Sequence, residues 1–134
     1  MLKKYLYFPL SAGVFGALVT ILYSFAYESA WKIEGEQLES LREAIPVWHL
    51  ILAPTLACFV AATGYFTLKN YLPKSGPFLF YFFFSSVSIF TSFAIFTVYG
   101  LHEEVQYIVA GYSMPMHFFP FLSWVTFKSL FFQD

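Results

Sequence analysis

Charge is scarce in this chain. Only 11% of its 134 residues are charged, 59% are hydrophobic, and the few basic residues form no patch. A soluble domain of this size cannot cover so much apolar side chain with polar surface. We expect no nucleic-acid partner, because such proteins present a basic patch to the phosphate backbone. The composition therefore indicates an integral membrane protein, with the lipid bilayer as its partner.

Cysteine pairs, membrane-embedded carboxylates and catalytic motifs are also lacking. The single cysteine, Cys58, excludes an intramolecular disulfide. No Asp or Glu lies within a hydrophobic stretch, whereas a proton-coupled antiporter usually keeps an acidic residue inside the bilayer. Neither Gly-x-Ser-x-Gly nor Cys-x-x-Cys occurs. We therefore expect a non-catalytic protein without a cofactor.

Long apolar stretches fill most of the chain, at residues 6–27, 47–68, 77–99 and 106–127. Each exceeds the ~20 residues that an α-helix needs to cross ~30 Å of hydrocarbon. Short connections make successive helices antiparallel neighbours. The sequence predicts a single all-α domain over residues 1–134, an antiparallel four-helix transmembrane bundle.

The charges alternate between the connections. Lysines lie at both ends of the chain and in the second connection: Lys3, Lys4, Lys69, Lys74 and Lys128. The glutamates lie in the first and third connections: Glu28, Glu34, Glu36, Glu39, Glu43, Glu103 and Glu104. Because Lys and Arg stay on the cytoplasmic side during insertion, we expect both termini in the cytoplasm.

The first apolar stretch has features of a signal peptide, with a basic start and the small-x-small sequence Ser24-Phe25-Ala26. Its apolar run is longer than the ~7–15 residues usual in a signal peptide. We therefore expect it to be retained as a membrane span.

The first connection contains a short amphipathic pattern. Leu38, Leu41 and Ile45 repeat at helical spacing, and the acidic residues lie on another face. This pattern predicts a short interfacial helix on the outer membrane surface, ended by Pro46.

Small residues recur on one side of three apolar stretches. Helices in lipid associate where small side chains let backbones approach and hydroxyl groups bond across. We expect the following residues to mark the inner faces of the bundle: Gly13, Ala17, Thr20 and Ser24; Ala53, Ala57, Ala61 and Gly64; Ser85, Ser88 and Ser92.

Aromatic residues make up 24% of the chain and follow two patterns. Amphipathic rings near span ends suit the headgroup layer, and these are Tyr5, Tyr7, Tyr27, Trp31, Trp48, Tyr99, Tyr107 and Trp124. The third stretch is rich in phenylalanines that we expect to contact lipid: Phe78, Phe80, Phe82, Phe83 and Phe84.

His117 lies about halfway along the last stretch, between two prolines. Such a buried polar ring must be hydrogen-bonded, so we expect it to face the bundle interior. Pro115 should free the carbonyl of Gly111, and Pro120 that of Met116. Two interpretations stay open. His117 either bonds to a serine of the third stretch or to a freed carbonyl, or belongs to a ligand site. The candidate ligand-binding residues are His117, Ser113, Ser88, Ser92 and Cys58.

A second candidate site lies on the acidic side of the predicted bundle. Carboxylates and imidazoles at similar depth are ligands that zinc or calcium accepts, although an acidic ridge on a surface helix is also a common solvated face. The candidate metal ligands are Glu36, Glu39, Glu43, His49, His102, Glu103 and Glu104. Copper is disfavoured, because Met114 and Met116 point about 200° apart on a helix.

The order of these features resembles that of small four-span bacterial membrane proteins grouped only as a domain of unknown function. The features are a basic amino terminus, a Gly/Ala-rich first span, Pro54 in the second, serines in the third and Met116-His117 in the last. The resemblance implies a multi-pass protein of a bacterial inner membrane and carries over no functional residues.

Three functions remain open from the sequence. We expect a non-catalytic protein that binds a partner protein, or a lipid-like ligand such as a quinone, within the bilayer, as a homo-oligomer or in a larger complex. The alternatives are an oligomeric transporter or channel that uses the serine stripe, and an enzyme acting on a lipid or quinone.

The topology is directly testable. A reporter that is active only in the cytoplasm, fused after Asp134, should be active, and a label placed at Glu39 should react from outside intact cells. A Glu39 label that reacts only after the cells are opened would contradict the predicted orientation.

Overall fold

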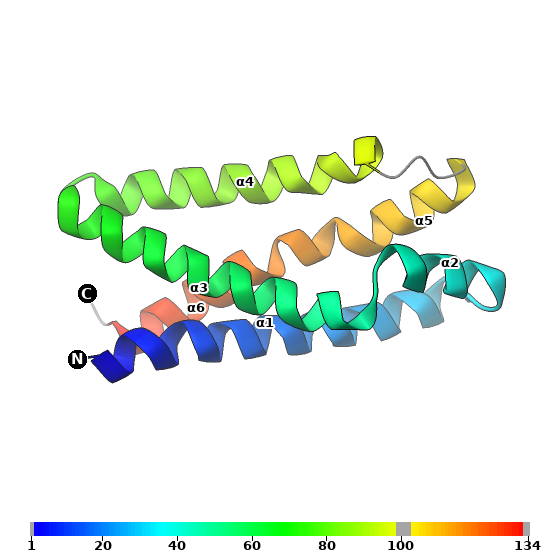
Figure 1. Ribbon diagram of the computed structural model, residues 1–134, viewed down its shortest axis with the longest axis horizontal. Helices are drawn as coiled ribbons and strands as arrows, with labels where there is room; N and C mark the ends of the chain where they lie inside the picture. Colours follow the sequence, from blue (N-terminus) through cyan, green and yellow to red (C-terminus); the bar gives the residue numbers. More distant parts are fainter. Residues whose placement is uncertain (1, 99–102, 133–134) are drawn as a thin grey trace.

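The computed structural model describes residues 2–98 and 103–132. These residues form helices and no strand. The elements are α1 (Leu2–Ala30), α2 (Glu36–Ala44), α3 (Val47–Tyr71), α4 (Gly76–Val98), α5 (Glu103–Ser113), the 3₁₀ helix η1 (Pro115–His117) and α6 (Phe119–Phe131) (Figure 1).

Three helical stretches are long and apolar enough to cross a membrane. They are Tyr5–Ala30, Glu36–Tyr71, which contains both α2 and α3, and Gly76–Ala94. They cover the first three predicted spans, 6–27, 47–68 and 77–99, except that Tyr99 lies outside the described residues. The protein is therefore all-α, with several candidate transmembrane helices packed together.

The predicted span over 106–127 corresponds to three successive elements, α5, η1 and α6. Proline has no backbone N–H and clashes with the preceding turn, so Pro115 interrupts the α-helical ladder. At the break, the N–H of His117 donates to Met114 at 3.3 Å and that of Phe118 to Pro115 at 3.0 Å. Pro120 lies in the first turn of α6, where its missing N–H costs no helical bond.

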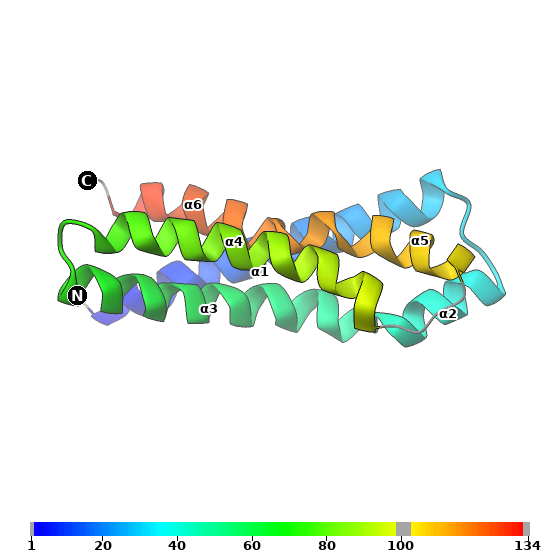
Figure 2. The ribbon, with the colours of Figure 1, turned by 90° about the horizontal axis from the view of Figure 1, so that it is seen from above.

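The long helices run alternately up and down. Figures 1 and 2 show the start of α1, the α3–α4 turn and the end of α6 at one end of the molecule, which we call the terminal end. The opposite end carries α2 and the start of α5, and we call it the α2 end. Lys69, Lys74 and Lys128 lie at the terminal end, and Glu36 and Glu39 at the α2 end. The alternation of charge in the sequence thus corresponds to two ends of opposite charge.

Helices α1 and α3 approach closely at Gly13. A Cβ atom on Gly13 would lie 2.8 Å from the Cα atom of Thr55, closer than real side chains pack. The small-residue face predicted for α1 is buried throughout, at Gly13, Ala17, Thr20 and Ser24. On α3 the predicted stripe is buried at Ala61, whereas Ala53 is exposed and lines a cavity between α3 and α4.

An aromatic core, which we call the Trp124 cluster, fills the terminal half of the bundle. Trp124 is fully buried against Phe8, Tyr65 and Phe80, with ring centroids 4.7–5.4 Å from its own. Two sequence-based expectations are therefore wrong. Trp124 packs inside the bundle instead of at the headgroup layer, and Phe80 faces the core instead of lipid, whereas Phe83 is exposed as predicted.

The short amphipathic helix predicted in the first connection is confirmed as α2. It ends before Pro46, whose missing N–H suits the start of α3. Leu41, fully buried, packs into a second core with Val109 and Tyr112 of α5 and Leu50 of α3. Helix α2 is thereby anchored to the bundle by its apolar face.

The close approach at Gly13 predicts that two leucine substitutions on α1 differ sharply in their effect on stability. Gly13→Leu should lower thermal stability and the yield of folded protein strongly, because bulk there must separate α1 from α3. Ala26→Leu, on an exposed part of α1, should leave both nearly unchanged. Equal melting temperatures for the two purified variants in detergent would show that α1 and α3 are not in backbone contact at Gly13.

Candidate ligand cleft

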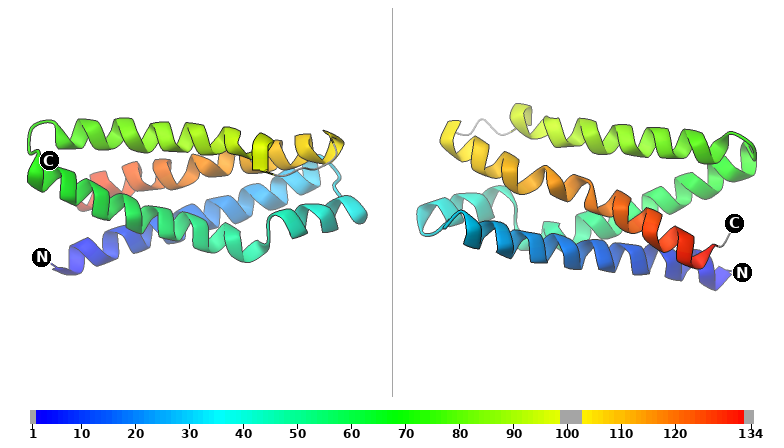
Figure 3. Two further views of the ribbon diagram at one scale, coloured as in Figure 1. Left: turned by 45° about the horizontal axis from the view of Figure 1, so that its top comes forward. Right: turned by 180° about the vertical axis from the view of Figure 1, so that it is seen from behind.

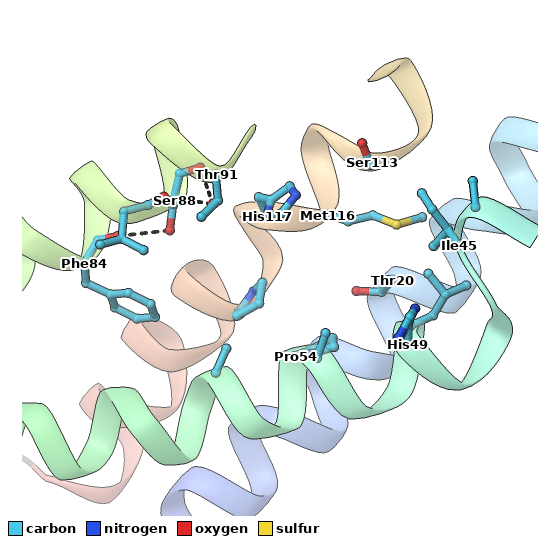
Figure 4. A pocket seen from close by; sticks show the side chains of 16 residues that line it. Thr20, Ile45, His49, Pro54, Phe84, Ser88, Thr91, Ser113, Met116 and His117 are labelled. Atoms are coloured by element: carbon cyan, nitrogen blue, oxygen red, sulfur yellow. Dashed lines mark hydrogen bonds between the residues drawn. The ribbon is translucent and has the colours of Figure 1, made fainter. Parts of the chain in front are cut away.

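A cavity of about 410 Å³ lies between α3, α4 and the broken last helix. Figure 4 shows its walls, with Pro54 and His49 on α3, Phe84 and Ser88 on α4, and His117 on η1. Thr20 of α1 and the end of α2, at Ala44, complete the lining. We call this cavity the cleft.

The cleft exists because α3 and α4 diverge from their shared turn. The N–H of Gly76 donates to Leu72 at 2.6 Å, and a Cβ atom at Gly76 would overlap the carbonyl of Leu68, so the turn requires glycine. Figures 1 and 3 show the two helices separating from this turn toward the α2 end. The Trp124 cluster fills the narrow half of the wedge, whereas the small side chains of Ala53 and Ala57 line the wide half.

The cleft opens to the side of the bundle. Its rim includes Val87, which is 55% exposed, together with the exposed residues Ala53 and Thr91. These residues belong to the two helices that flank the opening, α3 and α4. In a membrane such a side opening faces the lipid.

The polar groups of the cleft are few. Ser88 donates its hydroxyl hydrogen to the carbonyl of Phe84 at 3.0 Å, and Thr91 donates to Val87 at 2.8 Å, both within α4. The half-buried imidazole of His117 makes no hydrogen bond with any described residue. The predicted bond from His117 to a serine of α4 or to a freed carbonyl is therefore absent from the described part of the chain.

Two buried side-chain polar atoms have no hydrogen-bond partner in the described structure, Trp124 Nε1 in the aromatic core and Ser113 Oγ. Ser113 lines the cleft and is 5% exposed, and its Oγ atom is buried without a hydrogen bond. An unsatisfied buried hydroxyl costs about 1–3 kcal/mol, and such groups are rare in folded proteins. The Ser113 hydroxyl and the His117 imidazole thus lie on the same wall of the cleft, each without a hydrogen bond to a described residue.

The carbonyl that Pro115 frees is not available to a ligand. The hydroxyl of Tyr23 on α1 donates to the oxygen of Gly111 at 2.9 Å, and Tyr27 donates to Ile108 at 3.2 Å. Gly111 allows this approach, because a Cβ atom there would lie 2.5 Å from the Tyr27 hydroxyl. Two tyrosines of α1 therefore hold α5 in place.

The structure brings together His117, Ser113 and Ser88 of the predicted ligand-binding set. Ser92 is buried one turn beyond Ser88, donates to its carbonyl at 2.7 Å, and is not part of the cleft lining. Cys58 is buried in the Trp124 cluster, and its thiol approaches the Pro120 carbonyl at 3.7 Å.

Several lining residues had no distinctive sequence signal. Pro54, Ala57, Phe84 and Met116 are ordinary apolar residues of a span, and only the divergence of α3 and α4 gives them a common cavity. Thr91 follows Ser88 by three residues, so its helical spacing from the serine stripe is the signal that could have found it.

The acidic residues of the predicted metal site do not gather in the described structure. Glu36, Glu39 and Glu43 are exposed along α2, and His49 is exposed at the start of α3, beside the ring of Trp48. Among the described residues, no group of three or more His, Cys, Asp or Glu is placed to hold a metal ion. His102 and the side chains of Glu103 and Glu104 lie outside the described residues, so the metal site stays a prediction.

A polar contact closes the α2 end beside the cleft. Arg42 of α2 forms an ion pair with Glu28 of α1, and both side chains are mostly buried. Tyr112 of α5 donates to the same carboxylate at 3.2 Å and accepts from Arg42 at 3.5 Å. This Glu28–Arg42–Tyr112 contact fixes α2, and the last residue of α2, Ala44, borders the cleft together with Ile45, which follows it.

Comparison with protein-family models, with curated proteins and with solved structures finds no match to this chain.

The Glu28–Arg42–Tyr112 contact predicts that the protein depends on the charge of Arg42 for its stability and not on that of the neighbouring Glu43. Arg42→Gln should destabilise the protein by about 1–3 kcal/mol, because it leaves the Glu28 carboxylate largely buried without its cation. Glu43→Gln, one residue away and exposed, should have almost no effect. Proteolysis within residues 31–46 and thermal melting report the change, and equal behaviour of both variants would show that the ion pair does not hold α2.

Proposed function

We propose that this protein is a four-span protein of a bacterial inner membrane that binds a lipid-like molecule in the cleft. In this proposal α5, η1 and α6 together make a broken fourth span, and both termini lie in the cytoplasm. The observation that carries the proposal is the side-opening, mostly apolar cleft with a few convergent polar groups.

The size and lining of the cleft support binding of a small molecule. Ligand sites are typically concave, about 300–1,000 Å³ in volume, and mostly apolar with a few placed polar groups. The cleft volume of about 410 Å³ falls in this range. Its position between helices of a bundle is also a common place for ligand sites.

The hydrogen bonds of α4 favour binding over transport. Ser85, Ser86, Ser88, Thr91 and Ser92 all donate their hydroxyl hydrogens to carbonyls of their own helix. This is the usual way in which hydroxyl side chains are accommodated in an apolar helix. A continuous polar path along α4 is therefore not needed to explain its serine stripe.

The cleft also argues against an enzyme of lipids or quinones. A general acid–base reaction needs at least one group held near the reacting atom by a partner that orients it. The imidazole of His117 has no such partner among the described residues, and no carboxylate lines the cleft there. We therefore propose binding without catalysis, with a partner protein or a second copy of the chain as the alternative occupant.

Filling the cleft tests this function. Ala57→Phe places a ring inside the cavity and should remove lipid that copurifies with the protein, whereas Leu56→Phe changes an exposed neighbour on the same helix. Native mass spectrometry of wild type and both variants, released from detergent, reports the bound species. Equal lipid retention in all three proteins would contradict a ligand in the cleft, and loss of a bound protein instead of a lipid would favour the alternative occupant.

A further inference from the structure

We propose that the occupant of the cleft is a neutral lipid that carries a hydroxyl group, with the hydroxyl beside His117 and the hydrocarbon chain leaving between α3 and α4. This inference rests on the proposed function. It adds the chemical class of the ligand, which the charges and hydrogen bonds of the cleft restrict.

The charge of the cleft walls excludes ionised headgroups. Among the described residues no Lys, Arg, Asp or Glu lines the cleft. The single arginine of the chain, Arg42, is already paired with Glu28. A carboxylate or phosphate carried into an apolar site without a countercharge is strongly disfavoured. The cleft therefore suits a neutral molecule.

The hydrogen-bonding groups of the cleft then select a hydroxyl. The hydrogens of Ser88 and Thr91 are already donated within α4, so their oxygens offer only acceptor lone pairs to a ligand. A neutral imidazole at His117 offers one donor and one acceptor. A hydroxyl group both donates and accepts, so it can satisfy His117 and an α4 oxygen together. An ether or a ketone can accept a hydrogen bond from His117, but it cannot donate one to the oxygen of Ser88 or Thr91.

The placement of these groups in Figure 4 fits one small polar head. His117 projects from η1 toward the part of α4 that carries Ser88 and Thr91, while Pro54 lies on the facing helix. Most of the remaining walls are apolar, including Phe84, Val87 and Met116, and the other polar lining residues are Thr20, His49 and Ser113. A head bound at His117 therefore has hydrocarbon-like surroundings for the rest of the molecule.

Ser113 gives a second, independent indication of a ligand. It lies one helical turn before His117 on the same wall, and its buried hydroxyl has no partner in the described structure. An enclosed hydroxyl that neither donates nor accepts is most simply retained where a ligand supplies its hydrogen bond.

The side opening matches a hydrocarbon chain. Val87 and Ala53 flank the rim and are exposed on the outer surface of the bundle. A chain that leaves the cleft between them enters the bilayer directly, so the ligand can bind without passing through water. The hydrophobic part of the molecule then exchanges one apolar environment for another, and the head provides the selectivity.

Three probes with one hydrocarbon chain test the ligand class. Dodecanol, dodecyl methyl ether and dodecanoate at neutral pH are titrated into the protein in lipid nanodiscs, with binding followed by thermal shift and native mass spectrometry. Dodecanol should bind at least about tenfold more tightly than the other two, the factor given by about 1.4 kcal/mol. Ether or carboxylate binding as tight as that of the alcohol would overturn the hydroxyl assignment.

The same titrations separate this inference from the proposed function. If the three probes bind equally and Ala57→Phe abolishes all of the binding, the cleft remains a lipid site and only the hydroxyl assignment fails. If no probe binds, or Ala57→Phe changes nothing, both fail. A prenyl alcohol and a diacylglycerol, compared at equal membrane fraction, distinguish the two membrane sources of a neutral hydroxyl, and binding of either one supports the class.

Variants of His117 test the placement of the head. His117→Leu should keep the melting temperature of the free protein, since its imidazole has no partner to lose, but should weaken dodecanol binding about tenfold. His117→Gln restores a donor and an acceptor and should recover part of the affinity. Phe118→Leu, a neighbour that does not line the cleft, is the control. Unchanged dodecanol affinity in His117→Leu would overturn the placement, as would an equal loss in Phe118→Leu.

Discussion

A buried backbone carbonyl without a hydrogen bond is expensive, because no water replaces the missing donor. The last helical segment of this protein meets that constraint at Pro115, which cannot donate to Gly111. The hydroxyl of Tyr23 on α1 donates to this carbonyl instead, at 2.9 Å. A helix break that would be costly in isolation is thereby stabilised by a tyrosine on another helix, and Tyr27 supports the same segment one turn away.

The break divides the bundle into two unlike halves. Toward the terminal end, α6 inserts Trp124 among the rings of Phe8, Tyr65 and Phe80, and the space between α3 and α4 is filled. Toward the α2 end, η1 presents His117 to the gap where α3 and α4 diverge. One half is a packed aromatic core. The other is a cleft that forms where α3 and α4 diverge and that the interrupted helix lines with His117.

Hydrophobic length, small-residue spacing and the amphipathic pattern were enough to predict the three long helices, the buried face of α1 and helix α2. The sequence also placed His117, Ser113 and Ser88 in one candidate site. The sequence predicted that Pro115 would free the Gly111 carbonyl, but not that a 3₁₀ turn would divide the segment or that Tyr23 would bind that carbonyl, because this depends on a partner from another helix. Nor did it orient α3, where a rotation of one residue, about 100°, decides whether Cys58 faces a core or a cavity.

Photolabelling with a long-chain alcohol that carries a diazirine beside its hydroxyl tests most directly whether the cleft holds a neutral lipid head. After irradiation in nanodiscs, mass spectrometry maps the labelled residues. The account predicts labels concentrated on the cleft walls, near His117 and Ser88. Labels spread evenly over exposed apolar residues such as Leu22 and Phe25, without enrichment in the cleft, would contradict it.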